Sequence, residues 1–330
     1  MSGVSVAGPR WQVAVADHVR SLAWSSDGAR LLVVPATGAI AIHHGADGSV
    51  VRTWEGHRDG SCSGAWSPTG ELLATAGQDG RAWIRDTAGD SDVAIEVGRG
   101  WSEHVAWSPD GRLVAIANGR LARVYTLTGT LLADCGPHPV TVAAMAWSSR
   151  GWLATAAYGG VWLWRPETGE QRSYAWKGAP IGLAWSADGS HLAAAMQDSA
   201  VHVWRIADHR DWDLHGFPDK VRALAWEPKR PILITPGGAD LAVWRFDGSD
   251  PNGQPPVVLA QHEAPVMALA VSGTPQLFAT GDRAGQVVRW RNGRAEVLAT
   301  FADSISAMAW NVHHGSLAVG TADGTVAVFA

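Results

Sequence analysis

Three polar residues of the types that hydrolases use for nucleophilic catalysis occur within one short stretch of the chain: His57, Thr75 and Asp79. In a catalytic triad the histidine takes the proton of the hydroxyl group, and the carboxylate orients the imidazole ring. Such a nucleophile is accompanied by a Gly-rich oxyanion loop or a nucleophile elbow, and neither accompanies these residues. We therefore expect no catalytic residue among them.

The chain also contains 13 histidines, including the adjacent pairs His43–His44 and His313–His314, so a zinc site is the next alternative. Imidazole is a common zinc ligand. On a strand, however, residues i and i+2 share a face, whereas adjacent residues point to opposite faces. The pairs are therefore weak metal candidates, and we expect neither a metal nor any other cofactor.

These residues belong to a repeated unit. The stretch 106–119, AWSPDGRLVAIANG, returns in modified form about every forty residues along the chain. Within it, Ser108 to Gly111 has the residues that a type I turn prefers, since Pro109 presets φ and Gly111 relieves the last position. The apolar runs on both sides of this turn predict two strands.

The copies can be counted by the tryptophan that ends the first strand of each unit. Successive tryptophans are 38 to 42 residues apart, except for one gap of 84 that holds two periods. Val271 stands where the missing tryptophan is due, which brings the count to eight. The seven tryptophans are Trp24, Trp66, Trp107, Trp147, Trp185, Trp226 and Trp310.

A period of about forty residues with four short strand signals per copy is typical of β-propeller blades. We predict an all-β fold in which residues 1–330 form a single eight-bladed β-propeller domain of four-stranded antiparallel blades. The last copy, residues 304–329, has only three strands, whereas residues 11–16 form a strand that belongs to no copy. We expect this N-terminal strand to complete the last blade, which removes two sheet edges. Residues 207–220 and 246–256 are predicted to be long polar loops.

Composition and charge restrict the partners and the compartment. The chain is 46% hydrophobic and 17% charged with a net charge of −5, and it has no basic cluster of the kind that nucleic-acid binding needs. Cys62 and Cys135 are far apart and form no CxxC pair, which fits a reducing compartment. From the first residues we expect no secretory leader, and no apolar run in the sequence is long enough to span a membrane. We expect a cytoplasmic protein that binds neither nucleic acid nor membrane, and its 23 Arg against 3 Lys suggest a bacterial source.

Several repeated pieces resemble the WD-repeat β-propeller family across nearly the whole chain. The resemblance rests on Gly56–His57 and on residues 65–70 (AWSPTG) and 73–80 (LATAGQDG). His138 and His262 precede their strands as the family's Gly-His histidine does. Repetition of these pieces, rather than any single copy, makes the resemblance specific.

In that family a His, a Ser or Thr, an Asp and a Trp form a buried hydrogen-bonded set in each blade. The resemblance implies that His57, Thr75 and Asp79 are three members of such a structural network. Arg85 occupies the fourth place, and the family's Trp-Asp pair is mostly Trp-Arg in this chain, as at Trp290–Arg291. We therefore expect no blade to hold a complete set.

The resemblance also implies a function, because members of the family mostly act as interaction scaffolds. We expect a non-catalytic, monomeric ring that binds a protein or peptide partner. The alternatives are an enzyme or ligand-binding propeller with a site at the mouth of the central channel, and a zinc-linked accessory protein. Acids or bases that converge in the channel would favour catalysis, whereas an aromatic rim of mixed charge would favour a partner.

One face of such a ring carries the connections from each outer strand to the next inner strand, together with the turns between second and third strands. Trp and Arg are enriched where binding energy concentrates, and exposed aromatic side chains often mark an interaction site. The alternative for Trp101 and Trp176 is that they only cap the ends of neighbouring blades. The predicted partner-binding residues on this face are Arg58, Trp101, Glu103, Trp176, Lys177, Phe217, Lys220, Glu263 and Asp303.

Overall fold

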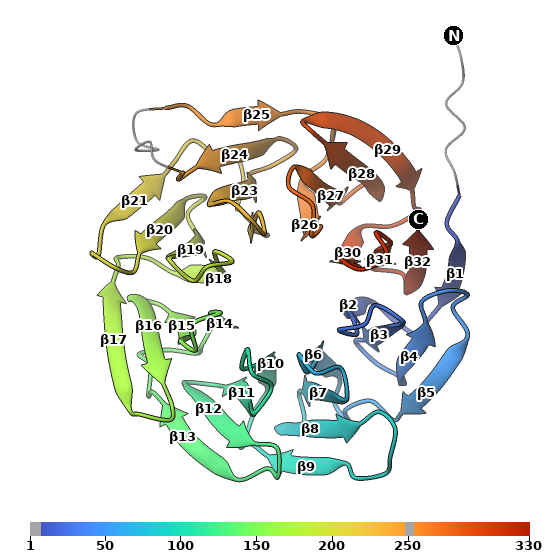
Figure 1. Ribbon diagram of the computed structural model, residues 1–330, viewed down its shortest axis with the longest axis vertical. Helices are drawn as coiled ribbons and strands as arrows, with labels where there is room; N and C mark the ends of the chain where they lie inside the picture. Colours follow the sequence, from blue (N-terminus) through green and yellow to red (C-terminus); the bar gives the residue numbers. More distant parts are fainter. Residues whose placement is uncertain (1–7, 248–253) are drawn as a thin grey trace.

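The computed structural model describes residues 8–247 and 254–330. Within these two ranges the chain forms eight antiparallel sheets of four strands and no helix, so none of these residues lies in a helix that could cross a membrane. Figure 1 shows the sheets side by side in a closed ring, with the first strand of each sequence repeat nearest the ring axis. The prediction of an eight-bladed β-propeller is confirmed.

The first four blades follow the chain in order. The first contains β2 (Val19–Trp24), β3 (Arg30–Pro35), β4 (Ile40–His44) and β5 (Val50–Trp54), and the second contains β6 (Ser61–Trp66), β7 (Leu72–Gly77), β8 (Arg81–Asp86) and β9 (Val93–Glu96). The third contains β10 (Ser102–Trp107), β11 (Leu113–Asn118), β12 (Leu121–Thr126) and β13 (Leu131–Cys135). The fourth contains β14 (Ala144–Trp147), β15 (Leu153–Ala157), β16 (Gly160–Arg165) and β17 (Glu170–Ala175).

The other blades repeat the pattern. The fifth contains β18 (Pro180–Trp185), β19 (His191–Met196), β20 (Val201–Arg205) and β21 (Asp211–Leu214), and the sixth contains β22 (Ala225–Trp226), β23 (Ile232–Pro236), β24 (Leu241–Arg245) and β25 (Val257–Leu259). The seventh contains β26 (Val266–Val271), β27 (Leu277–Asp282), β28 (Gln286–Arg291) and β29 (Arg294–Thr300). The eighth contains β30 (Ile305–Trp310), β31 (Leu317–Thr321), β32 (Thr325–Phe329) and β1 (Trp11–Ala14).

The turn between the first two strands of the third blade depends on one serine. Gly111 N donates to Ser108 O at 2.9 Å, and Leu113 N donates to Ser108 Oγ at 2.9 Å. Ser108 Oγ in turn donates to the Asp110 carboxylate at 2.6 Å. Gly111 has a φ of 71°, which glycine adopts without steric cost. The predicted turn at residues 108–111 is therefore present.

At six of the eight junctions, neighbouring blades are joined by the tryptophan that ends an inner strand. Trp66 Nε1 donates to the carbonyl of Ala23 in the preceding blade at 2.9 Å. Trp24 Nε1 makes the same bond to Ala309 O at 3.1 Å, across the junction where the ring closes. The same bond joins Trp107 to Ala65, Trp147 to Ala106, Trp185 to Ala146 and Trp226 to Ala184.

The apolar core lies between blades rather than inside any one of them. Leu32, Ile42 and Trp54 of the first blade are buried against Trp66 and Leu73 of the second. A four-stranded blade has two apolar faces and covers neither by itself, so each blade is stable only when both neighbours are present. Tryptophan suits this role because it combines a large apolar ring with one polar atom that needs a partner.

The N-terminal strand closes the ring as predicted. β1 pairs with β32 from Trp11 opposite Val328 to Ala14 opposite Thr325, and Val15 N continues the pairing to Gly324 O at 2.8 Å. Trp11 is only 8% exposed, and its Nε1 donates to Gly45 O of the first blade at 3.0 Å. β1 therefore connects the last blade to the first.

The prediction that residues 207–220 form a loop is wrong. Residues 207–220 contain β21 (Asp211–Leu214), which is the outer strand of the fifth blade and pairs with β20. Trp212 and Leu214 are buried in this strand, while Asp211 is exposed. Because polar residues surround Trp212 and Leu214, the alternation of exposed and buried residues was not recognised in the sequence. In the other predicted loop, residues 248–253 lie outside the described residues.

Removal of the closing strand should destabilise the whole ring. Deletion of residues 1–17 exposes the edge of β32 and removes Trp11, and replacement of a buried Trp by Ala alone costs about 3 to 5 kcal/mol. We expect a large fall in the midpoint of thermal unfolding measured by circular dichroism. Deletion of residues 1–8, which leaves β1 intact, is the control. An unchanged midpoint for the longer deletion would contradict the role of β1.

The indole hydrogen bond between blades can be tested without a large change in shape. The Trp107→Phe variant keeps a ring but leaves Ala65 O without its donor, so we expect a loss of about 1 to 3 kcal/mol in the free energy of unfolding. Trp310→Phe is the matched control, because Trp310 Nε1 has no hydrogen-bond partner among the described residues. Denaturant titration should show the larger loss for Trp107→Phe. Equal losses would mean that packing alone joins the blades.

Candidate functional site

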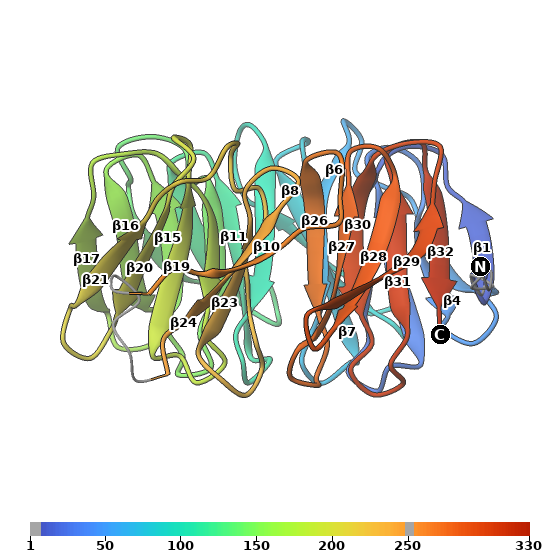
Figure 2. The same cartoon turned by 90° about the horizontal axis from the view of Figure 1, so that it is seen from above.

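The ring has two faces with different connections. We call the face that carries the outer-to-inner connections and the second-to-third strand turns the upper face, and it is uppermost in Figure 2. The lower face carries the first-to-second and third-to-fourth strand turns. All nine predicted partner-binding residues belong to the upper end of the ring, because each lies between an outer strand and the next inner strand or at the start of an inner strand.

A histidine network holds the upper-face connection between β5 and β6. His57 Nδ1 lies 3.0 Å from Asp79 Oδ1, and His57 Nε2 lies 3.1 Å from Thr75 Oγ1. Asp79 also accepts hydrogen bonds from the backbone amides of Arg58 and Arg81, at 3.2 and 3.1 Å. The three side chains link the β5–β6 connection to the turn between β7 and β8 by hydrogen bonds. This geometry agrees with the structural role that the resemblance implies.

The seventh blade contains a complete four-residue set, which corrects the expectation that no blade is complete. Trp290 Nε1 donates to Thr280 Oγ1 at 2.8 Å, Thr280 Oγ1 lies 2.7 Å from His262 Nε2, and His262 Nδ1 lies 2.8 Å from Asp282 Oδ2. The complete set was not recognised in the sequence because Asp282 follows Thr280 by two residues, whereas Asp79 follows Thr75 by four. A search that allowed this variable spacing would have found the set.

The fourth blade holds a shorter version of the same network. His138 Nε2 lies 2.8 Å from Thr155 Oγ1, which accepts a hydrogen bond from Trp164 Nε1 at 2.8 Å. His138 Nδ1 lies 3.0 Å from the backbone carbonyl of Arg120 and not from a carboxylate. A backbone acceptor therefore replaces the Asp, and the connection from β13 to β14 remains anchored.

These networks favour neutral histidines. In each, Nδ1–H can donate to an oxygen that only accepts, while Nε2 accepts the threonine proton, and an imidazole with one proton satisfies both bonds. Burial lowers the pKa of His57, His138 and His262, because the charged imidazole would lose its hydration. Burial acts to raise the pKa of Asp79, but its hydrogen bonds to His57 and to backbone amides lower it overall. The networks thus fix the backbone of the connections. The threonine hydroxyl groups are hydrogen-bonded within them, so none of them is a free nucleophile.

The charged members of the predicted set are mostly accessible. Arg58, Lys177, Glu263 and Asp303 are exposed in four different connections, and Lys220 is half-buried in a fifth. Glu103 lies within β10 rather than in a connection. The charges therefore surround the ring instead of gathering in one place. A shallow hollow of about 580 Å³ beside the β5–β6 connection has Arg58 at its rim.

The three predicted aromatic residues divide into two kinds. Trp101 is 55% exposed in the connection from β9 to β10. Trp176 instead packs against His202, with ring centroids 3.6 Å apart, and Phe217 packs near Trp244 at 6.0 Å. For Trp176 the alternative of capping a blade therefore agrees with the contacts, and Phe217 belongs to the same class.

Two exposed apolar residues of the upper face were missed. Tyr158, in the turn from β15 to β16, is 56% exposed, and Val140, in the connection from β13 to β14, is also exposed. An aromatic residue directly before the glycine pair Gly159–Gly160 was the available signal, because such a turn leaves its side chain in solvent. Together with Trp101, these residues place exposed apolar side chains over the third and fourth blades.

The inner strands show which groups stand around the ring axis at the upper end. In six of the eight blades the second residue of the inner strand lies at a register shift, and such β-bulges change the direction of a side chain. The residues at these shifts are Arg20, Cys62, Glu103, Ile181, Met267 and Ser306. Burial raises the pKa of the Cys62 thiol, so it is not an activated nucleophile. This mixed set is not a convergence of acids or bases.

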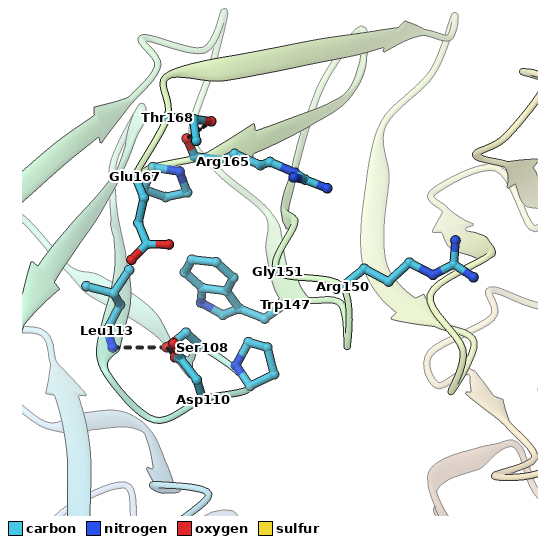
Figure 3. A pocket seen from close by; sticks show the side chains of 11 residues that line it. Ser108, Asp110, Leu113, Trp147, Arg150, Gly151, Arg165, Glu167 and Thr168 are labelled. Atoms are coloured by element: carbon cyan, nitrogen blue, oxygen red, sulfur yellow. Dashed lines mark hydrogen bonds between the residues drawn. The ribbon is translucent and has the colours of Figure 1, made fainter.

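The lower face carries a hollow of about 190 Å³ between the third and fourth blades. Figure 3 shows Glu167 and Trp147 beside it, while Arg150 extends away from Glu167. Arg150 Nε donates to Asp188 O at 2.6 Å. Asp110 accepts hydrogen bonds within its own turn. Arg150 and Asp110 are therefore engaged outside the hollow, and Arg165 lies 3.6 Å from Glu170. Glu167 is left beside the hollow, and none of these contacts pairs an acid with a base inside it.

The histidine pairs do not come together as ligands. His43 is buried, with Nδ1 2.8 Å from Gly48 O and its ring stacked 6.0 Å from that of Trp11. His44, His313 and His314 are exposed. In residues 8–247 and 254–330, no group of three His, Cys, Asp or Glu side chains is arranged to hold a metal ion.

Comparison with known proteins adds sequence and fold relatives. The family model described as WD domain, G-beta repeat, matches residues 48–86 and 171–205. The F-box-like/WD repeat-containing protein TBL1Y of Homo sapiens is 26% identical over 50% of this chain and 35% of its own length. The B-type cell cycle switch protein ccs52A of Medicago truncatula is 28% identical over 70% of this chain and 51% of its own length.

Two further proteins match over most of their length. The serine-threonine kinase receptor-associated protein of Dictyostelium discoideum is 22% identical over 81% of this chain and 92% of its own length. The crystal structure of the computationally designed Ika8 protein superposes with a TM-score of 0.84 and 20% identity, over 98% of this chain and 99% of that one. That likeness concerns the fold alone. The chain spans about half or less of the TBL1Y and ccs52A relatives.

The buried neutral histidines predict a stability that falls in mild acid. Their folded pKa is below the unfolded value of about 6.5, so the unfolded chain takes up protons first as the pH decreases. Each such histidine can lower the free energy of unfolding by up to about 1.4 kcal/mol per pH unit below that value. Urea titrations at about pH 7.5 and about pH 5.5 should show the decrease, which precedes the titration of carboxylates. Equal stability at the two pH values would contradict neutral buried histidines.

Proposed function

We propose that this chain, which is a WD-repeat β-propeller, is a non-catalytic scaffold that binds a protein or peptide partner on its upper face. Two of the relatives carry names that refer to other proteins or to regulation, a receptor-associated protein and a cell cycle switch protein. Those names describe the relatives, and they support an interaction role here. The residues described above supply the site for such a role.

The observation that carries the proposal is an exposed tryptophan on a fixed backbone. Trp101 is 55% exposed, yet its backbone carbonyl accepts a hydrogen bond from Asn118 Nδ2 at 3.1 Å. The same Nδ2 also bonds Gly100 O at 3.2 Å and Ser102 Oγ at 3.3 Å, and Asn118 itself is buried. The buried Asn118 side chain thus fixes the backbone at Trp101, while the large apolar side chain of Trp101 remains exposed to water. Binding loses little backbone entropy at such a position, which favours its use as a contact residue.

The surroundings of Trp101 fit a protein surface. Tyr158 and Val140 expose further apolar area over the adjoining blade, and Arg58 and Lys177 flank this region in the connections on either side. Aromatic side chains with a charged rim are typical of protein interfaces. We propose a monomeric ring in the cytoplasm, and the net charge of −5 argues against nucleic acid as the partner.

The proposal predicts that a pair of exposed residues controls partner capture. The Trp101→Ser, Tyr158→Ser double variant should lose a partner that the wild-type protein captures and that mass spectrometry identifies, with at least about a tenfold weaker affinity. Its thermal midpoint should stay unchanged, because both side chains are more than half exposed.

Two controls separate binding from stability. Val312→Ser changes an exposed residue of the lower face and should leave capture intact. Trp176→Ser removes a ring packed on His202 and should lower the thermal midpoint instead. Undiminished capture by the double variant would refute the proposed binding face.

A further inference from the structure

Five blades carry an arginine near the lower end of the third strand, where the Trp-Arg pairs of the sequence lie. In four of these blades the arginine forms an ion pair with a nearby carboxylate. The four pairs are Arg85–Asp92 at 2.9 Å, Arg165–Glu170 at 3.6 Å, Arg205–Asp208 at 2.5 Å and Arg245–Asp247 at 2.9 Å. In the seventh blade the corresponding residue is Arg291, and its side chain has no charged or hydrogen-bonding partner within the described parts of the chain.

The residue opposite Arg291 is a second arginine. In the pairing of β28 with β29, Arg291 lies opposite Arg294. The next pair on the same face, Arg289 and Glu296, joins opposite charges at 2.9 Å. Arg294 is exposed, as Arg291 is, and its side chain likewise has no partner among residues 8–247 and 254–330. Like charges directly opposite each other destabilise a sheet, so this blade carries a repulsion that the other four avoid.

Strand alternation turns both arginines toward the eighth blade. Arg291 shares a face of β28 with Val287, which is buried in the core between the seventh and eighth blades. Arg289, on the same face, donates to Ala330 O beyond β32 at 3.2 Å. The lower turn of the eighth blade, residues 311–316, contains no Asp or Glu and exposes two histidines. The neighbouring turn therefore offers no carboxylate to Arg291 and Arg294.

An open hollow of about 620 Å³ lies over this face of the seventh blade. Its lining residues are Arg289, Arg291, Asn292, Arg294, Ala295 and Glu296. Glu296 is the only acid among them, and it is paired with Arg289. None of these residues has a large apolar side chain, whereas pockets for small molecules are lined mainly by apolar and aromatic groups. The hollow therefore suits an anionic group that belongs to a larger partner.

We propose that this hollow binds a phosphorylated side chain of a partner protein, with the phosphate group between Arg291 and Arg294. In the other blades one carboxylate neutralises one arginine, but here two arginines share one place. A phosphate monoester carries a charge of about −1.5 to −2 at pH 7 and three acceptor oxygens, so it can neutralise both. Arginine also binds phosphate through two parallel hydrogen bonds.

The surroundings favour a protein as the source of the phosphate. A small phosphate ester would find no apolar wall in the hollow, whereas a partner protein can make its further contacts on the surface around it. Two arginines are too few for the many phosphate contacts of nucleic acid, whose phosphodiesters carry only one charge each. The site lies at the lower end of the ring and is separate from the proposed upper-face site.

The test uses a set of fluorescein-labelled peptides with a central phosphoserine or phosphothreonine and varied flanking residues. Fluorescence anisotropy should show saturable binding to the full chain for at least one of them, at concentrations below about 1 mM. The same peptide without the phosphate should not bind, and with Glu at its centre it should bind at least about tenfold more weakly, because Glu carries a single charge. Inorganic phosphate should compete only at concentrations above those of the unlabelled phosphopeptide. A single-stranded RNA oligonucleotide of similar length should not bind.

Matched variants locate the site and separate binding from stability. Arg294→Glu gives Arg291 the carboxylate that the other four blades supply, so the thermal midpoint at low ionic strength should rise. Phosphopeptide binding by the same variant should fall at least about tenfold, because a carboxylate then occupies the place of the phosphate. Arg291→Gln should weaken binding as well. Arg112→Glu is the control, since it makes the same charge change at an exposed residue in the lower turn of the third blade and should leave binding unchanged.

Several results would overturn the proposal. These are a lack of saturable binding by every phosphopeptide, equal binding with and without the phosphate, and equal losses for Arg294→Glu and Arg112→Glu. Inorganic phosphate that competes as well as the phosphopeptide would refute a protein source and assign the hollow to a small anion. Preferential binding of RNA would refute it in favour of nucleic acid. A fall in the thermal midpoint of Arg294→Glu would contradict the repulsion between the two arginines on which the proposal rests.

Discussion

The hydrogen bond from an inner-strand indole to the alanine carbonyl of the preceding blade is the interaction on which the ring depends. It sets how closely consecutive inner strands approach, as in Trp66 to Ala23 and Trp24 to Ala309. The acceptor residue is alanine in all six cases, and its small side chain leaves room for the indole ring. Because the apolar core lies between blades, this contact supplies both burial and a direction that apolar packing alone does not give.

The repeated contacts were visible in the sequence because they require particular residues at a regular interval. Tryptophans about forty residues apart and the turn at residues 108–111 were sufficient to count the blades and to place the closing strand. β21 escaped prediction because Asp211 and the polar residues before it conceal the buried Trp212 and Leu214. Strand pairing with β20, rather than local sequence, determines that segment.

The site residues were less predictable, because exposure depends on neighbours that are distant in the sequence. Trp101 and Trp176 occupy equivalent connections, but only Trp176 has a partner ring in the next blade, that of His202. Sequence alone cannot distinguish them. The complete network in the seventh blade was missed for a related reason. The Asp follows its Thr by two residues in the seventh blade and by four in the second, yet it lies 2.8 and 3.0 Å from the histidine Nδ1 in these two blades.

The pairing of β1 with β32 also has a consequence for synthesis of the chain. Trp11 leaves the ribosome long before its partner Val328, so the first strand has no sheet to join while the blades between them are made. Contacts of such high sequence separation slow folding and leave edges open to other chains in the meantime. A nascent chain of this kind is most vulnerable to aggregation when seven blades are made and the eighth is not. The cellular yield of folded protein would then depend on how quickly the last blade is synthesised as much as on the stability of the finished ring.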